Sequence, residues 1–165
     1  MSLRGAQRRR NLMRSPRSVA AGRAMTLKMK YRVLFVCVEN SCRSQISEGL
    51  ARHLGSNILE VWSAGSIPSG EIHPLAIQVL KEKGINASHQ KSKGLRELPS
   101  YEWDYIVTMG CGDACPHLPA KHRLDWNLAD PKGQPIEAFR KTRDEIEKQI
   151  QSLIKEIRAT ASTSR

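Results

Sequence analysis

The sequence predicts an α/β fold: a four-stranded, parallel, open sheet with helices on both faces. Short runs of β-branched and aromatic residues, such as VLFV at 33–36, are typical of strands buried on both faces of a parallel sheet. Segments with apolar residues at helical spacing alternate with these runs, as in βαβ units. The 165 residues, 39% of them hydrophobic, suit one domain with a sizeable core.

Each element has its own signal. In the first helix, expected to start near Ser44, Ile46, Leu50 and Leu54 recur at helical spacing. Pro74 suits the first turn of a second helix, which Gly84 ends. The expected strands are residues 33–36, 58–62, 103–109 and 122–126, and the last helix spans 136–158. The turn-rich stretch SIPSGEIHP (66–74) and residues 85–99 have weak periodicity, and no function is predicted for them.

Charge is unevenly distributed along the chain. Residues 1–24 contain seven arginines, no lysine and no acidic residue, and so supply +7 of the net charge of +11. The basic character therefore belongs mostly to this N-terminal tail, and no nucleic-acid partner is expected for the folded domain.

The domain is expected at residues 29–158, with residues 159–165 fraying beyond it. Residues 1–28 are interpreted as a disordered basic tail or as a mis-assigned start, with translation beginning at Met25 or Met29. The tail lacks the apolar core of a secretory signal, and no stretch is apolar enough to cross a membrane. A cytoplasmic protein without a membrane partner is therefore expected.

The loop between the first strand and the first helix carries the strongest chemical signal. Such a loop aims several backbone N–H groups at one point and can hold an oxyanion. Arg43 adds a planar cation suited to bidentate contact, and a thiol at Cys37 is expected to act as a nucleophilic thiolate, with Ser44 donating to it and Asn40 tying the loop to its neighbours. The predicted oxyanion-binding residues are Val38, Glu39, Asn40, Ser41, Cys42, Arg43 and Ser44.

Two plainer interpretations compete with this one. Cys37 can be a buried structural cysteine followed by an ordinary surface arginine, but the spacing of strand end, cysteine, arginine and helix start is more restrictive than that. The second alternative interpretation is a zinc site, with Cys111, Cys115 and His117 as three ligands and Cys37 or Cys42 as the fourth ligand. No second compact cysteine pair accompanies them, so no metal site is predicted.

Further reactive groups follow the ends of other strands. Cys111 and Cys115 come after the third strand, and Asp130 after the fourth. In an open parallel sheet the ligand crevice lies beyond the carboxyl ends of the strands, so these groups can share one site with Cys37. Two chemistries stay open: a relay of thiol exchange, or phosphate-ester cleavage through a phosphocysteine with Asp130 as acid and base.

These motifs resemble the low-molecular-weight protein tyrosine phosphatase superfamily, and more closely its arsenate reductase branch. The resemblance covers residues from about Tyr31 to Leu153. The stretch CVENSCRSQISEG resembles the signature loop of that branch, with Gln45 where tyrosine phosphatases usually carry proline. Further similar stretches are SAGSIPSGEIHPLAI, TMGCGDACPHLP, WNLADPKG and RKTRDEI. The resemblance thus implies a low-molecular-weight phosphatase-like fold.

It also implies a function, the reduction of arsenate to arsenite. Cys37 attacks arsenate, Arg43 and the loop amides hold its oxygens, Cys111 attacks the adduct, and Cys115 attacks the resulting disulfide. No bound cofactor is implied, only an external thiol reductant, either thioredoxin or a small thiol. The sequence departs from the pattern at the shorter spacer between Cys111 and Cys115 and at Glu39, where the family often has glycine. Phosphatase activity on phosphate monoesters is the alternative, and an oxyanion-binding module without turnover is a third class.

Overall fold

The structure is a computed structural model that describes residues 29–112 and 117–164. The expectations for residues 1–28 and for Cys115 therefore lie outside the described residues. The described strands are β1 (Tyr31–Cys37), β2 (Leu59–Gly65), β3 (Trp103–Thr108) and β4 (Ala120–Asp125). The helices are α1 (Arg43–Leu54), α2 (Pro74–Lys81), the short 3₁₀ helix η1 (Leu95–Glu97) and α3 (Ile136–Thr163).

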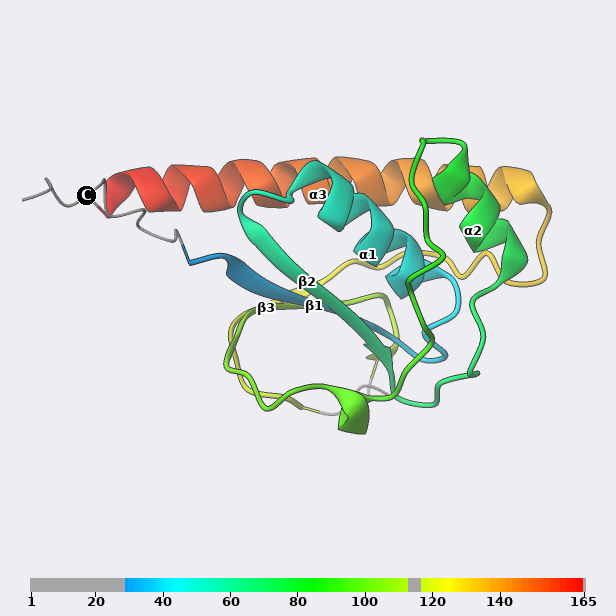
Figure 1. Ribbon diagram of the computed structural model, residues 1–165, viewed down its shortest axis with the longest axis horizontal. Helices are drawn as coiled ribbons and strands as arrows, with labels where there is room; N and C mark the ends of the chain where they lie inside the picture. The colour runs from blue at the N-terminus through cyan, green and yellow to red at the C-terminus, as the bar shows by residue number, and fades with distance from the viewer. Residues whose placement is uncertain (1–28, 113–116, 165) are drawn as a thin grey trace, which may run out of the picture.

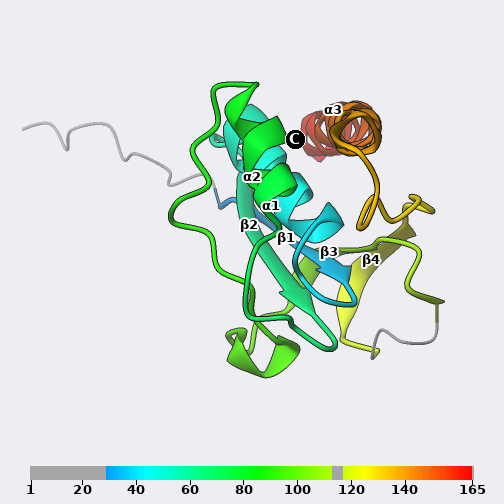
Figure 2. The same ribbon diagram turned by 90° about the vertical axis from the view of Figure 1, so that its right-hand side faces the viewer.

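The four strands form one parallel sheet in the order β2-β1-β3-β4, which confirms the predicted sheet (Figure 2). Its register places Cys37 opposite Gly65 at the end of β1, and Thr108 opposite Asp125 at the end of β3. The carboxyl ends of all four strands therefore meet at one edge. Residues 38–42, the loop that is predicted to hold an oxyanion and is called the oxyanion loop below, start at this edge, where a ligand crevice is expected.

Helices cover the two faces of the sheet unequally. The three α-helices lie together over one face, and of the described helices only η1, with its flanking loops, lies against the other (Figures 1 and 2). The second helix, α2, packs against α1 and α3 instead of crossing to the opposite face. Alternating residues of β1 point to the two sides, with Val33 and Phe35 toward the α-helices and Leu34 and Val36 toward η1.

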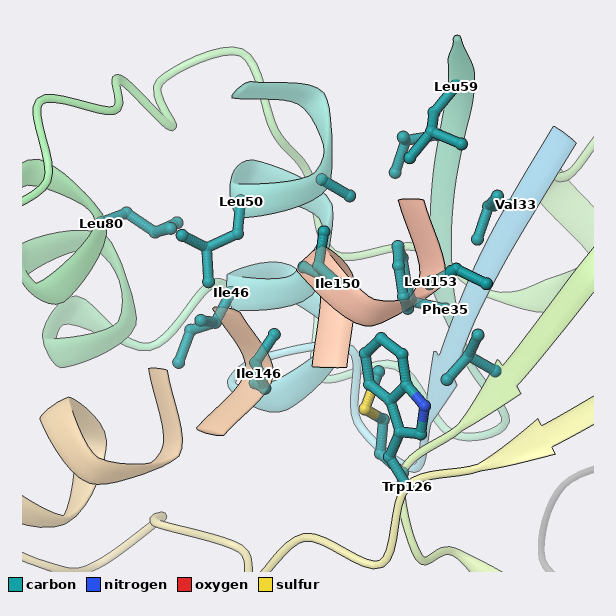
Figure 3. Packing of buried hydrophobic residues seen from close by; sticks show 14 of the residues in the cluster. Val33, Phe35, Ile46, Leu50, Leu59, Leu80, Trp126, Ile146, Ile150 and Leu153 are labelled. Atoms are coloured by element: carbon teal, nitrogen blue, oxygen red, sulfur yellow. The ribbon is translucent and has the colours of Figure 1, made fainter. Parts of the chain in front are cut away.

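The larger core lies between the sheet and the α-helices. Figure 3 shows Ile46 and Leu50 of α1 beside Ile146 and Ile150 of α3, with Phe35 of β1 to their right. These five side chains are at most 1% exposed. Because α1 is fixed on both sides by this packing, its first turn and the loop before it have a defined position over the sheet.

Some boundaries differ from the predicted ones for physical reasons. Strand β2 continues through Gly65 because its polar and small residues still pair with β1. Strand β4 starts earlier, at Ala120; it is an edge strand with mostly exposed side chains, so its apolar pattern is weak. Helix α3 continues beyond residue 158 to Thr163, where hydroxyl side chains donate to carbonyls one turn earlier. Within residues 29–112 and 117–164, no helix has the length and apolar character needed to traverse a bilayer.

Candidate active site

The loop at residues 38–42 is held from outside by the segment after β2. Backbone N–H groups of that segment donate to three loop carbonyls, as Ile67 to Val38 (2.8 Å), Ser69 to Glu39 (3.0 Å) and His73 to Ser41 (3.0 Å). In contrast, the N–H groups of Glu39, Ser41 and Cys42 donate to no described residue. Free N–H groups just before the N-terminus of a helix can bind an oxyanion, which is the role that the sequence predicts for this loop.

The sulfur of Cys37 lies at the base of this loop, and Cys37 is only 3% exposed. The backbone N–H of Asn40 donates to Cys37 Sγ at 3.2 Å, and Ser44 Oγ lies 2.8 Å from the same sulfur. Because Ser44 Oγ already accepts from Asn40 Nδ2 at 2.8 Å, its own proton is directed to the sulfur. Two donors on one sulfur suit a thiolate, the nucleophilic form of cysteine.

Asn40 organises the loop from within. Its φ is +50°, in the left-handed region that asparagine tolerates better than most residues. Its side chain is fully buried, and its amide donates to Ser44 and, at 3.0 Å, to Ser63 Oγ. Its Oδ1 accepts from Gln45 Nε2 at 2.8 Å and from the backbone N–H of Lys93 at 2.9 Å. Asn40 thus ties the loop to its neighbours, as predicted, through four side-chain hydrogen bonds.

Gln45, which replaces the proline usual in tyrosine phosphatases, links the loop to a distant segment. Its amide donates to Asn40 and also to the carbonyl of Lys91 at 3.0 Å. Gln90 donates in turn to Gln45 Oε1 at 2.8 Å. Proline can make none of these bonds, so the glutamine fastens residues 90–93 to the underside of the loop.

Glu48 is a functional-site neighbour that the sequence does not reveal. Only 2% exposed, it accepts a hydrogen bond from Ser63 and pairs with Arg52 at 2.8 Å and with Lys93 at 3.6 Å. Its charge is therefore compensated where it is buried, as a buried carboxylate requires. Since Ser63 also accepts from Asn40, this cluster supports the loop from behind.

Arg43 is nearly buried and points toward the ends of β3 and β4. Its Nη1 donates to the carbonyls of Met109 and Leu128, and its Nη2 lies 3.3 Å from Asp130 Oδ2. Arg43 and Asp130, predicted to share the site, are therefore in contact. An oxyanion that binds through Nη2 of Arg43 therefore shares this group with the Asp130 carboxylate.

A small pocket lies over the loop. It is lined by Cys37, Glu39, Ser41, Cys42, Arg43, Asp130 and Lys132. Glu39 belongs to this lining, and its carboxylate pairs with Nζ of Lys132, another lining residue, at 2.5 Å. Lys132 is thus a second residue that sequence reasoning missed, although it follows Asp130 by two positions in LADPKG. No aromatic residue belongs to this lining.

Cys42 also lines the pocket, and its environment keeps its thiol protonated. Burial, followed by the nearby negative charge of Asp130, raises the pKa of Cys42 to about 12. Its thiol is therefore protonated at neutral pH and a poor nucleophile.

The other predicted cysteines relate to the site in different ways. Cys111 follows the carboxyl end of β3, two residues after Met109, whose carbonyl accepts from Arg43. Cys37 and Cys42 are free thiols, whereas Cys111 is disulfide-bonded. Cys115, which belongs to both the relay and the alternative zinc set, lies outside the described residues. Within residues 29–112 and 117–164, no three His, Cys, Asp or Glu side chains gather as a metal-binding group.

Comparison with known proteins agrees with this geometry. The chain is 37% identical over 129 residues to the glutaredoxin arsenate reductase of Synechocystis, covering 76% of this chain and 98% of that protein. A solved structure of an arsenate reductase in the phosphate-binding state is 38% identical, with a TM-score of 0.70 over 78% of this chain and 99% of that one. The thioredoxin-dependent arsenate reductase of Corynebacterium glutamicum is 40% identical, with a TM-score of 0.66 over 79% of this chain and 63% of that one.

The family itself follows from a match that spans most of the chain. Residues 32–163, from β1 to the end of α3, match the family described as low molecular weight phosphotyrosine protein phosphatase. This range contains the oxyanion loop and the two segments that support it, residues 66–73 and 90–93. It also contains residues 126–135 between β4 and α3, called the Asp130 loop below. The chain therefore belongs to the low molecular weight phosphotyrosine protein phosphatase family.

Proposed function

We propose that this protein reduces arsenate to arsenite with electrons from an external thiol. One observation carries the proposal: Cys37 lies in an oxyanion loop at the end of β1, and Cys111 follows the end of the adjacent strand β3. Relatives and solved structures of similar sequence are named arsenate reductases, which supports the same activity here.

The first step is attack of the Cys37 thiolate on arsenic. The free N–H groups of the loop and the Arg43 guanidinium hold the arsenate oxygens, while Ser44 and the N–H of Asn40 hold the sulfur. A sulfur–arsenic bond forms, and one arsenate oxygen leaves as water after it is protonated. Arsenic is still in its pentavalent state at this point.

The second step moves the electrons. An external thiol first reduces the disulfide that holds Cys111. The Cys111 thiolate then attacks Cys37 Sγ, so that a new disulfide forms and the sulfur–arsenic bond breaks. The electron pair of that bond stays on arsenic, which leaves as trivalent arsenite. Cys115 then attacks Cys111 and frees Cys37, and an external dithiol or two small thiols reduce the remaining disulfide. A thioredoxin-like donor is supported by the name of the Corynebacterium relative.

Phosphate-ester hydrolysis is the alternative, and Asp130 favours it. Its carboxylate lines the pocket beside Arg43, where it can protonate a leaving group and later activate water. The described residues that line the pocket include no aromatic side chain to stack on a tyrosine ring, however. Trp126, the aromatic residue nearest to Asp130 in the sequence, is buried and packs on Phe35 with ring centroids 5.6 Å apart.

Two serine variants separate these functions. Cys111→Ser is expected to abolish arsenate reduction, measured with a thioredoxin system and with small thiols, while inorganic phosphate still binds. Cys37→Ser is expected to abolish both reduction and any hydrolysis of an aryl phosphate. Circular dichroism and urea unfolding serve as controls that both variants are folded.

The results rank the proposals. Aryl phosphate turnover without arsenate reduction in the unmodified protein contradicts the reductase proposal and favours the phosphatase. Phosphate binding with neither activity favours the third class, an oxyanion-binding module. Full reduction by the Cys111→Ser variant contradicts the relay.

A further inference from the structure

The ion pair between Glu39 and Lys132 joins two loops that are far apart in the sequence. Glu39 belongs to the oxyanion loop and Lys132 to the Asp130 loop, and their charged atoms lie 2.5 Å apart. Both side chains line the pocket that contains Cys37 and Arg43. Any oxyanion that reaches Cys37 therefore meets these two charges.

The backbones of both residues are fixed, so the side chains can part without movement of the loops. The carbonyl of Glu39 accepts from the N–H of Ser69 at 3.0 Å and from Ser92 Oγ at 3.2 Å. The N–H of Lys132 donates to Asp130 Oδ1 at 3.1 Å. Lysine carries its charge on a flexible four-carbon stem, so rotation of that stem suffices to move the ammonium from Glu39 to another anion.

Apart from the sulfur of Cys37, four charged side chains of the described residues line the pocket, and their charges balance one another. Two are cations, Arg43 and Lys132, and two are carboxylates, Asp130 and Glu39, and each cation is paired with one carboxylate. A dianionic oxyanion must compete with those carboxylates for the cations. The charge of Glu39 therefore works against the ligand, and that of Lys132 works for it.

Stability of the fold is a poor explanation for this ion pair. The side chains of Lys132 and Glu39 are 49% and 38% exposed, and exposed pairs contribute little to the free energy of unfolding. The charge of Lys132 also acts on the loop. It lowers the pKa of the buried Cys42 thiol, although the larger effect of burial raises that pKa overall. A role in ligand binding fits both observations.

We propose that Lys132 is a further oxyanion-binding residue and that Glu39, by pairing with it, limits the affinity of the pocket for dianionic tetrahedral oxyanions. The proposal rests on the proposed function only in using the same pocket. It concerns binding and needs no arsenate reduction.

The test is the affinity of the full chain for inorganic phosphate, measured by isothermal titration calorimetry at low salt. Glu39→Gln frees Lys132 and is expected to tighten binding roughly three- to tenfold, whereas Lys132→Ala leaves Glu39 unpaired and weakens binding by a similar factor. The double variant is expected to stay within about twofold of the unmodified protein. All differences are expected to shrink at about 0.5 M salt.

Lys121→Ala is the matched control, because Lys121 is an exposed lysine that pairs with a carboxylate, Asp104, at 3.2 Å but does not line the pocket. It is expected to leave phosphate affinity unchanged. Weaker binding by both single variants indicates a structural role and overturns the proposal, as does no change in either. If the unmodified protein does not reduce arsenate but the two single variants shift phosphate affinity in opposite directions, only the proposed function is contradicted.

Discussion

Replacing Asn40 by alanine tests whether the loop depends on its buried hydrogen bonds. The change removes four side-chain bonds, to Ser44, Ser63, Gln45 and the N–H of Lys93. Each is worth about 1 kcal/mol net, and a left-handed backbone costs alanine about 1 kcal/mol more, so we expect a loss of roughly 3–5 kcal/mol. Because total stabilities are about 5–15 kcal/mol, the variant is expected to fold but to be clearly weakened.

Urea unfolding, followed by tryptophan fluorescence, measures this loss. Asn40→Gly is the matched control: it loses the same four bonds, but glycine adopts the observed φ of +50° without strain. Both variants keep the N–H that donates to Cys37, so any loss of phosphate affinity reports displacement of the loop. A free energy of unfolding within about 1 kcal/mol of the unmodified protein for Asn40→Ala refutes the reasoning.

Two further predictions concern the loop. A Cβ added at Gly65 would lie 2.5 Å from the carbonyl oxygen of Val38 and 2.8 Å from the backbone nitrogen of Asn40. Gly65→Ala is therefore expected to displace the loop and to weaken phosphate binding at least about tenfold in calorimetry. Gly94→Ala is the control and is expected to leave binding unchanged, because its added Cβ would lie 3.4 Å from the nearest atom. Because burial raises the pKa of Cys42 to about 12, the unfolded chain loses this proton first, and the free energy of unfolding falls as the pH rises from about 9 toward 12. The urea midpoint is expected to fall less between pH 7 and pH 10.5 for Cys42→Ala than for the unmodified protein. Equal falls in the two proteins contradict the raised pKa of Cys42 as the cause.

The sheet and the site loop were predictable because their signals are local. A continuous apolar run marks β1, and helical spacing placed the start of α1 within one residue of its observed start at Arg43. The contacts of Ser44 and Asn40 with their predicted partners also follow from their place in the loop. Parallel pairing then brings Asp130 to the same edge, so that it meets Arg43.

The remaining features depend on contacts that leave no periodic signal. Glu39 and Lys132 are 93 positions apart, and nothing in either local sequence indicates that they pair. Glu48 reads as an ordinary helical carboxylate, and its burial against Ser63 is decided by how α1 packs on β2. The placement of α2 beside α1 and α3, on the same face, likewise follows from packing and not from its own amphipathic pattern.

The segments without a predicted function are the ones that shape the oxyanion loop. Residues 66–73 supply the N–H groups that engage the loop carbonyls, and residues 90–93 hold Asn40, Gln45 and Glu39 from the other side. A backbone N–H that donates no hydrogen bond within the protein stays available to a ligand only if neighbouring segments hold the loop in its conformation. Turn-rich segments can do this because their backbone groups are not used in a sheet or helix. The conformation of the loop around Cys37 therefore depends on irregular segments far from it in the sequence, as much as on the helix that follows it.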